Sequence, residues 1–300
     1  MTRSFLAAAL VAAAVLAGCS GADDAPAAAP ATSSPAPPSE TPSTTPSAAG
    51  DVYLALGDSL AAGYQPGGAE LRDSAYPALA AARIGRDGDD LAVENLACSG
   101  ESTTSFLEGG LCDYDDGSQM EQAEALLAER AGEVALVSID IGGNDLRRCV
   151  GRELTVDASC VEDGLGTVRE NLPTILSRLR AAAGPDVPVL VLGYYNPWLA
   201  ASYLGEGQAE LDAASDAYSA LDTAITRAAK GAGAQSVPLT AAFKLDDDSP
   251  TTFGGREVPT NVAQVCTLTY ICTAFDIHLT DEGAAVVARV LADAADKAGV

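Results

Sequence analysis

The chain has 300 residues, with 42 acidic and 17 basic side chains and a formal net charge of −25. A surface this negative repels nucleic acids and anionic membrane surfaces, which argues against either as a direct binding partner. The sequence contains no glycine-rich dinucleotide fingerprint and no phosphate-binding loop, so hydride transfer and phosphoryl transfer have no support.

The first 50 residues differ in composition from the rest and predict an export signal followed by a tether. A basic start and an apolar run from Phe5 to Leu16 make residues 1–18 a signal peptide, too short for a stable membrane span. The ending Leu16-Ala17-Gly18-Cys19 resembles a bacterial lipobox, in which Cys19 is acylated; the alternative is an ordinary signal peptide with an incidental cysteine. Residues 19–50 are mostly Ala, Pro, Ser and Thr, which bury too little apolar surface to fold. We therefore predict a disordered tether that holds residues 51–300 at the outer face of the cell membrane, or a secreted protein if Cys19 carries no lipid.

Residues 51–300 alternate between apolar segments and amphipathic segments, and their number suits one α/β domain. Strands are predicted at 52–57, 91–96, 134–141, 187–194 and 234–239. Helices are predicted at 76–84, 119–130, 161–183 (kinked at Pro173), 207–230 and from 280, with 240–275 irregular. Because the strands are apolar throughout and alternate with helices, we expect a parallel sheet of about five strands covered by helices on both faces, a three-layer α/β/α fold.

The six cysteines that follow Cys19 form an even set, which in an exported chain implies disulfides. Their spacing favours neighbour pairing: Cys98 with Cys112, Cys149 with Cys160, and Cys266 with Cys272. A zinc site is the weaker alternative, since the chain has no CxxC pair and one histidine. The acidic runs at 113–116 and 246–248 lack the ligand spacing of a calcium loop. We expect neither a metal nor another cofactor.

Three polar or flexible residues follow the first three predicted strands. Ser59 follows the first strand, Gly100 the second and Asn144 the third. The carboxyl ends of parallel strands meet at one edge of the sheet, so a hydroxyl, a backbone N–H and a side-chain amide are expected in one cleft. These groups suit acyl transfer, which needs a nucleophile and donors for a developing oxyanion. By its own local sequence, Ser59 or Asp58 fits equally well as the N-cap of a helix.

The chain contains a single histidine, His278, just before the last predicted helix. A serine hydroxyl is a weak nucleophile until a base removes its proton. A lone histidine is more often a surface or capping residue, but Ser59, Gly100 and Asn144 favour His278 as that base.

Four blocks of the sequence resemble those of the GDSL, or SGNH, hydrolases. In family order they are Gly57-Asp58-Ser59-Leu60, Asn95 to Gly100, Gly142-Gly143-Asn144-Asp145 and Asp276-Ile277-His278. The resemblance covers essentially the whole folded region. Within the family, the chain looks most similar to the secreted actinobacterial-type esterases and lipases. It implies a flavodoxin-like sheet and hydrolysis of carboxylic esters without a metal. It also implies Ser59 as nucleophile, His278 as base, and the N–H groups of Ser59 and Gly100 with the amide of Asn144 as oxyanion donors.

One position departs from the family pattern. The family usually places its histidine-orienting aspartate three residues before the histidine, where this chain has Phe275; Asp276 is two before. Either Asp276 reaches the imidazole through a tighter loop, or a backbone carbonyl such as that of Phe275 takes its place. We favour Asp276 slightly.

Aromatic residues after the fourth strand are candidates for substrate contacts. Tyr195 and Trp198 leave the same edge of the sheet as Ser59, so their rings could hold an acyl or aryl group, or could simply pack against the core. Phe106, inside the predicted Cys98–Cys112 loop, is a weaker candidate for the same wall.

These features together predict an exported, membrane-tethered serine esterase or lipase that forms an acyl-enzyme on Ser59. The alternative is a solute-binding envelope lipoprotein without catalysis, which would share the anchor, the tether and the acidic surface. It has no need for a lone histidine aligned with a serine. The acyl chain, the alcohol and the oligomeric state are not readable from the sequence, because loops rather than strands shape the pocket.

Overall fold

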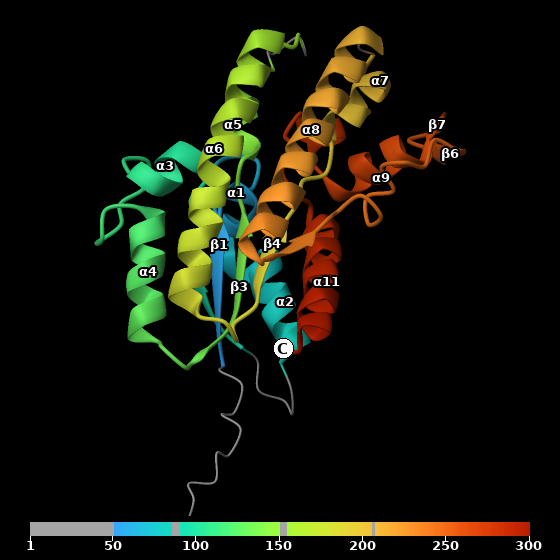
Figure 1. Ribbon diagram of the computed structural model, residues 1–300. Helices are drawn as coiled ribbons and strands as arrows, with labels where there is room; N and C mark the ends of the chain where they lie inside the picture. Colours follow the sequence, from blue (N-terminus) through green and yellow to red (C-terminus); the bar gives the residue numbers. More distant parts are fainter. Residues whose placement is uncertain (1–50, 86–90, 151–154, 206–207) are drawn as a thin grey trace, which may run out of the picture. The chain divides into compact units, whose positions relative to one another are not determined.

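The computed structural model describes residues 51–85, 91–150, 155–205 and 208–300 (Figure 1). The signal peptide, Cys19 and the tether predicted for residues 1–50 lie outside these ranges. Of the helices that the structure describes, none has a stretch long and apolar enough to cross a lipid bilayer.

A five-stranded parallel sheet in the order β2-β1-β3-β4-β5 forms the centre of the fold. Its strands are β1 (Val52–Gly57), β2 (Ala92–Asn95), β3 (Val134–Asp140), β4 (Val189–Leu192) and β5 (Gln235–Val237). The chain runs from β1 to one side and then crosses to β3 on the other, so the strand order switches beside β1. Open α/β sheets with this flavodoxin-like order bind ligands at the carboxyl ends of the strands at that switch point. The predicted fold class is confirmed.

Alternate side chains of β1 point to opposite faces of the sheet and join two separate apolar cores. Tyr53 and Ala55 pack in one core, and Val52, Leu54 and Leu56 pack in the other. The first core is covered by α2 (Tyr76–Ile84), α9 (Thr260–Leu268) and α11 (Asp281–Ala298). The second is covered by α3 (Thr103–Glu108), α4 (Gln119–Glu129), α6 (Ala158–Ala183) and α8 (Gln208–Ala232) (Figure 1).

Short helices and 3-10 turns lie between the strands and the long helices. They are α1 (Ser59–Ala62), α5 (Gly143–Arg147) and α7 (Ala201–Leu204), with 3-10 turns η1 (Arg72–Ser74) and η2 (Pro197–Ala200). The long helices agree closely with the predicted ranges, and α6 continues through Pro173. The predicted start of the fourth helix, at Gly207, lies outside the described residues. Edge strand β2 is only half-buried, contrary to the expectation that every strand is buried on both faces.

The prediction of an irregular segment at 240–275 is wrong. The strands β6 (Pro250–Phe253) and β7 (Arg256–Pro259) form an antiparallel hairpin there, and α9 and α10 (Ile271–Ala274) follow. The hairpin turns at Gly254 and Gly255, both with positive φ, which glycine adopts without strain. These elements are too short and too polar on one side to show a clear period in the sequence.

Three disulfides join Cys98 to Cys112, Cys149 to Cys160, and Cys266 to Cys272, which are the neighbour pairs that the spacing favours. Each bridge lies close in the chain to a residue of the predicted site: Cys98 precedes Gly100, Cys149 follows Asn144, and Cys272 precedes His278. The bridges therefore restrain the loops that carry the site.

Candidate active site

Ser59 lies at the first position of α1, directly after the sharp turn that ends β1. Gly57 has a φ of 131°, and a Cβ there would lie 2.2 Å from the carbonyl oxygen of Asp140, so only glycine fits. Asp58 is the N-cap of α1, and its Oδ1 accepts a hydrogen bond from Leu60 N at 3.0 Å. The capping role therefore belongs to Asp58, and the hydroxyl of Ser59 is not used as a cap.

Side-chain and backbone hydrogen bonds bring the ends of the first three strands together. Asn144, in α5, donates from Nδ2 to the carbonyl oxygen of Glu101 at 3.0 Å and to Asp58 Oδ2 at 3.3 Å. Gly100 has a φ of 90°, and its N–H has no backbone partner among the described residues. The amide of Asn144 thus bridges the residue before Ser59 and the residue after Gly100.

Gln119 is a buried residue of this site that the sequence did not reveal. Its side chain is 0% exposed and pairs with both backbone groups of Gly57: Oε1 accepts from Gly57 N at 2.7 Å, and Nε2 donates to Gly57 O at 3.0 Å. Nε2 also donates to Glu101 Oε2 at 3.0 Å. One amide therefore ties the turn before Ser59 to the residue after Gly100. A glutamine on the apolar face of α4, beside Met120, was the signal that could have revealed it.

Two carboxyl groups, those of Asp58 and Asp140, lie close together at the turn that carries Ser59. Tyr194 donates to Asp58 Oδ2 at 2.6 Å, and Tyr76 donates to Asp140 Oδ1 at 2.5 Å. Burial and the neighbouring charge of Asp58 raise the pKa of the Asp140 carboxyl well above its usual range. Burial likewise raises the pKa of Glu101. Both shifts favour the protonated forms, which limits the negative charge buried around Ser59.

His278 is buried and precedes α11. Asp276 Oδ1 lies 2.5 Å from His278 Nδ1 and accepts from the backbone N–H of His278 at 2.9 Å. The ring of Tyr64 packs against the imidazole with centroids 4.3 Å apart. His278 and Ser59 line the same small cavity, together with Tyr64 and Tyr76. With Nδ1 engaged by Asp276, Nε2 is the nitrogen available for a second partner.

The carbonyl of Phe275, the other orienting group considered, makes no hydrogen bond to the imidazole among the described contacts. Phe275 ends α10 in the left-handed region, with a φ of 54° and a side chain 54% exposed. The segment beyond it is held by its own backbone, with Tyr270 N donating to His278 O at 3.0 Å. Tyr195 adds a hydrogen bond to the carbonyl of Ile277.

The candidates for substrate contact have different surroundings. Tyr195 lines a cavity of about 30 Å³ beside Ser59 and stacks on Phe243 at 4.5 Å. Trp198 is half-buried and does not line this cavity, whereas its neighbour Pro197 does. Phe106 lines neither cavity beside Ser59, and its side chain is fully buried in the core. The residues that line this cavity are Asp58, Ser59, Leu60, Gly143, Asn144, Arg147, Tyr194, Tyr195, Pro197, Tyr218 and Ile277.

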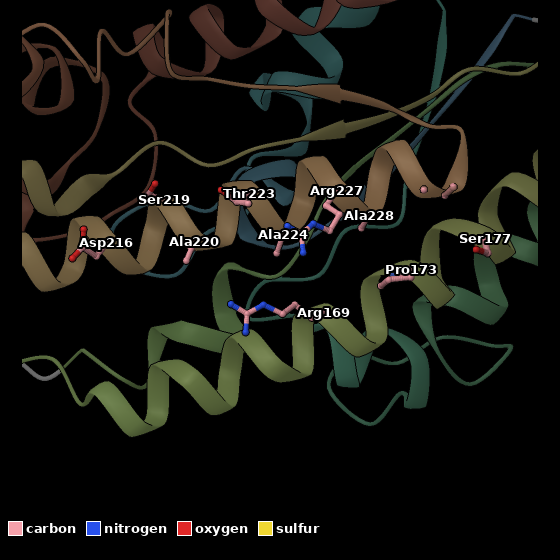
Figure 2. Close-up of a pocket in the computed structure, with 12 residues that line it drawn as sticks. Arg169, Pro173, Ser177, Asp216, Ser219, Ala220, Thr223, Ala224, Arg227 and Ala228 are labelled. Carbon is pink, nitrogen blue, oxygen red and sulfur yellow. The ribbon is translucent and has the colours of Figure 1, made fainter.

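A larger groove of about 750 Å³ lies elsewhere, between α6 and α8 (Figure 2). Arg169 and Pro173 line it from α6, and a stripe of small residues lines it from α8. Neither Ser59 nor His278 borders it, so it is separate from the candidate active site. Within the described part of the chain, no three His, Cys, Asp or Glu side chains gather as a metal site.

Comparison with known proteins shows the family and supports the fold. The model of the GDSL-like Lipase/Acylhydrolase family matches residues 55–286. Among solved structures, an extracellular lipase from Streptomyces rimosus superposes with a TM-score of 0.53 at 21% identity, covering 81% of this chain and 98% of the lipase. A catalytic mutant of an acetylxylan esterase from Geobacillus stearothermophilus gives a TM-score of 0.51 at 15% identity, covering 82% of this chain and 94% of the esterase. At these identities the two structures support the fold. No curated protein matches the chain.

Proposed function

The chain belongs to the GDSL-like lipase/acylhydrolase family and is a carboxylic ester hydrolase, and we propose that it acts through an acyl-enzyme on Ser59 with His278 as general base. The observation that carries this proposal is the pairing of His278 Nδ1 with Asp276 at 2.5 Å beside a cavity that Ser59 also lines. Membership of a hydrolase family sets aside the alternative of a solute-binding lipoprotein.

In the proposed reaction, His278 Nε2 takes the proton of Ser59 as the serine oxygen bonds to the ester carbonyl carbon. The carbonyl oxygen becomes an oxyanion, stabilised by the N–H groups of Ser59 and Gly100 and by the amide of Asn144. The intermediate then breaks its bond to the alcohol oxygen, which takes the proton from His278. Water repeats the sequence on the acyl-enzyme, releases the acid and restores Ser59.

Donation by Asn144 requires a change of partner. Both hydrogens of its amide are engaged, by Glu101 O at 3.0 Å and by Asp58 Oδ2 at 3.3 Å. The longer bond is the weaker one. We propose that the oxyanion replaces Asp58 as the acceptor, while Glu101 holds the amide in place.

The proposed role of Asp276 is to hold His278 in the tautomer with hydrogen on Nδ1 and to stabilise the imidazolium. The same carboxylate oxygen accepts from the His278 backbone N–H, which supports an orienter two residues before the histidine. Tyr195 is proposed to shape the acyl site, since it borders the cavity beside Ser59.

We further propose that the protein is exported and anchored by a lipid on Cys19. Three disulfides support folding in an oxidising compartment outside the cytoplasm. Mass spectrometry of the membrane fraction tests the anchor, because a diacylglyceryl group on Cys19 adds a defined mass that Cys19→Ser removes.

Hydrolysis of 4-nitrophenyl acetate and labelling by a fluorophosphonate test the nucleophile. We expect turnover by the wild type, and loss of both turnover and labelling in Ser59→Ala. Ser177→Ala, exposed on α6 and remote from both cavities that Ser59 lines, serves as the control and should keep both. Equal turnover in Ser59→Ala would remove Ser59 from the mechanism.

A further inference from the structure

Arg147 brings a positive charge to the cavity beside Ser59. It is the last residue of α5, three positions after Asn144, and residues at this spacing lie on the same side of a helix. Both residues border the cavity that Ser59 lines. A group bound at Arg147 would therefore lie one helical turn from the amide proposed to bind the oxyanion.

Among the described residues, Arg147 forms no ion pair with the acid of this cavity. Of the described residues that line it, Arg147 is the single cation and Asp58 the single acid. The Asp58 carboxylate already accepts hydrogen bonds from Leu60, Tyr194 and Asn144. The ion pairs of the described residues do not include Arg147, whose side chain is exposed.

The tyrosine hydroxyls of the cavity do not supply a negative charge either. Burial raises the pKa of Tyr218 to about 12, with Arg147 acting in the opposite direction, and burial raises the pKa of Tyr194 well above its usual range. Both phenols are therefore neutral at ordinary pH. The guanidinium of Arg147 faces a site whose other polar groups are uncharged or already satisfied.

This position matters because the rest of the chain is strongly acidic, with a formal net charge of −25. The electrostatic field of this negative charge repels an anionic substrate, and a cation beside Ser59 offsets that repulsion at the site itself. A guanidinium also matches the geometry of carboxylate and phosphate, to which it can donate two parallel hydrogen bonds. Because the cavity itself holds only about 30 Å³, a charged group would lie at its mouth, where Arg147 is exposed.

We propose that Arg147 selects esters that carry a carboxylate or a phosphate near the scissile bond. The proposal rests on the proposed function of Ser59 and extends it to a substrate class. Arg147 is a specificity-determining residue in this view, and it takes no part in the proton transfers.

Matched pairs of esters test the proposal in the full-length protein. Both arms place the charge at the para position of the leaving phenol: the carboxylate arm compares 4-acetoxybenzoate with its neutral methyl ester, and the phosphate arm compares 4-phosphooxyphenyl acetate with 4-methoxyphenyl acetate, with release of the phenol measured in each. The measured quantity is the ratio of kcat/KM for the charged ester to kcat/KM for its neutral partner. Because Arg147 is exposed, where a charged pair contributes modestly, Arg147→Gln should lower this ratio about 3- to 5-fold in at least one arm. The arm that responds identifies the anionic group.

The adjacent residue provides the control. Arg148 is equally exposed and does not border the cavity, so Arg148→Gln should leave the ratio within about twofold. Arg147→Lys, which keeps the charge but loses the bidentate fork, should give an intermediate ratio. A ratio that is unchanged in Arg147→Gln in both arms, or that falls equally in Arg148→Gln, would overturn the proposal. Neither result bears on Ser59, whose role is decided separately by Ser59→Ala on a neutral ester.

Discussion

The two halves of the candidate site are held in place by different means. Ser59, Gly100 and Asn144 follow three neighbouring strands, and buried side chains from distant parts of the chain fix their loops, above all Gln119 and Tyr194. His278 lies on a connection between two helices. That connection is held by contacts within the segment 266–280, namely the Cys266–Cys272 disulfide, the Tyr270–His278 backbone bond and the Asp276 carboxylate. Two tyrosines from elsewhere, Tyr64 and Tyr195, add a ring contact and one hydrogen bond.

This difference indicates where each half is vulnerable. The nucleophile half should respond to substitutions far away in sequence, because remote side chains satisfy its backbone groups. The base half should respond mainly to substitutions close to His278. The following predictions test this contrast, beginning with the largest expected effect.

Removal of the base tests whether the two halves act as one unit. We expect His278→Ala to lower kcat/KM about 10⁴- to 10⁶-fold, because the serine then lacks its proton acceptor. Adding Ser59→Ala should lower it little further, since groups that act together are not additive. Rates measured with 4-nitrophenyl acetate for both single variants and the double variant check this. Independent, multiplying effects would show that the two residues do not cooperate.

The local support of the base half is tested at Asp276. Asp276→Asn should lower kcat about 10²- to 10⁴-fold with little change in KM, because the amide can favour the wrong imidazole tautomer. Asp293→Asn, on the exposed side of α11, is the matched control and should leave kcat and KM unchanged. If Asp276→Asn remains folded by circular dichroism and keeps full turnover, the carboxylate does not orient His278.

The remote support of the nucleophile half is tested at Gln119. Gln119→Leu removes two hydrogen bonds to Gly57 and one to Glu101. We expect kcat to fall roughly 10- to 100-fold, because Ser59 and the oxyanion donors are then no longer held at fixed relative positions. Gln122→Leu, on the same helix but partly exposed, should change kcat less than about twofold.

The reciprocal exchange Gln119→Glu with Glu101→Gln sharpens this test. It restores a hydrogen bond between positions 119 and 101 with its direction reversed, so the double variant should be faster than Gln119→Glu alone. A double variant no faster than the single one would show that the link between these two positions does not matter.

The smallest effect concerns stability and pH. The pKa of Asp140 is raised in the folded protein, so protonation of this carboxyl group stabilises the fold. The contribution is complete below the unfolded-state pKa of about 3.9 and is lost as pH rises through the folded-state pKa. In urea titrations from pH 4 to 8.5, the wild type should therefore lose stability relative to Asp140→Asn as pH rises.

Asp157 provides the opposite case, in urea titrations extended downward from pH 4 to about pH 2. Hydrogen bonds at the N-terminus of α6 lower its pKa, so the contribution of its charged form is lost as pH falls. The stability difference between the wild type and Asp157→Asn should therefore shrink toward acid pH.

For Asp140, a stability difference between the wild type and Asp140→Asn that does not change with pH would contradict the raised pKa of this carboxyl group.

Sequence reasoning succeeded where the signal is local. The apolar runs of β1 and β3 are long enough to specify buried strands, and the spacing of apolar residues in 161–183 specifies one face of α6. It failed for 240–275, where the hairpin and α9 are short and their stability comes from packing against the rest of the fold. It also did not reveal that Phe106 lies within α3 with its side chain in the core.

The sequence by itself determined the α/β class, the neighbour pairing of the cysteines and the positions of Ser59, Gly100, Asn144 and His278 in the chain, because each depends on residues that are close in sequence. Only the tertiary structure decided what surrounds them. Asp58 rather than Ser59 caps α1, Asp276 rather than the Phe275 carbonyl contacts His278, and Gln119 bridges the two loops. The Gln119 contacts depend on how α4 packs against the sheet, and the two local contacts depend on loop conformations that sequence spacing does not specify.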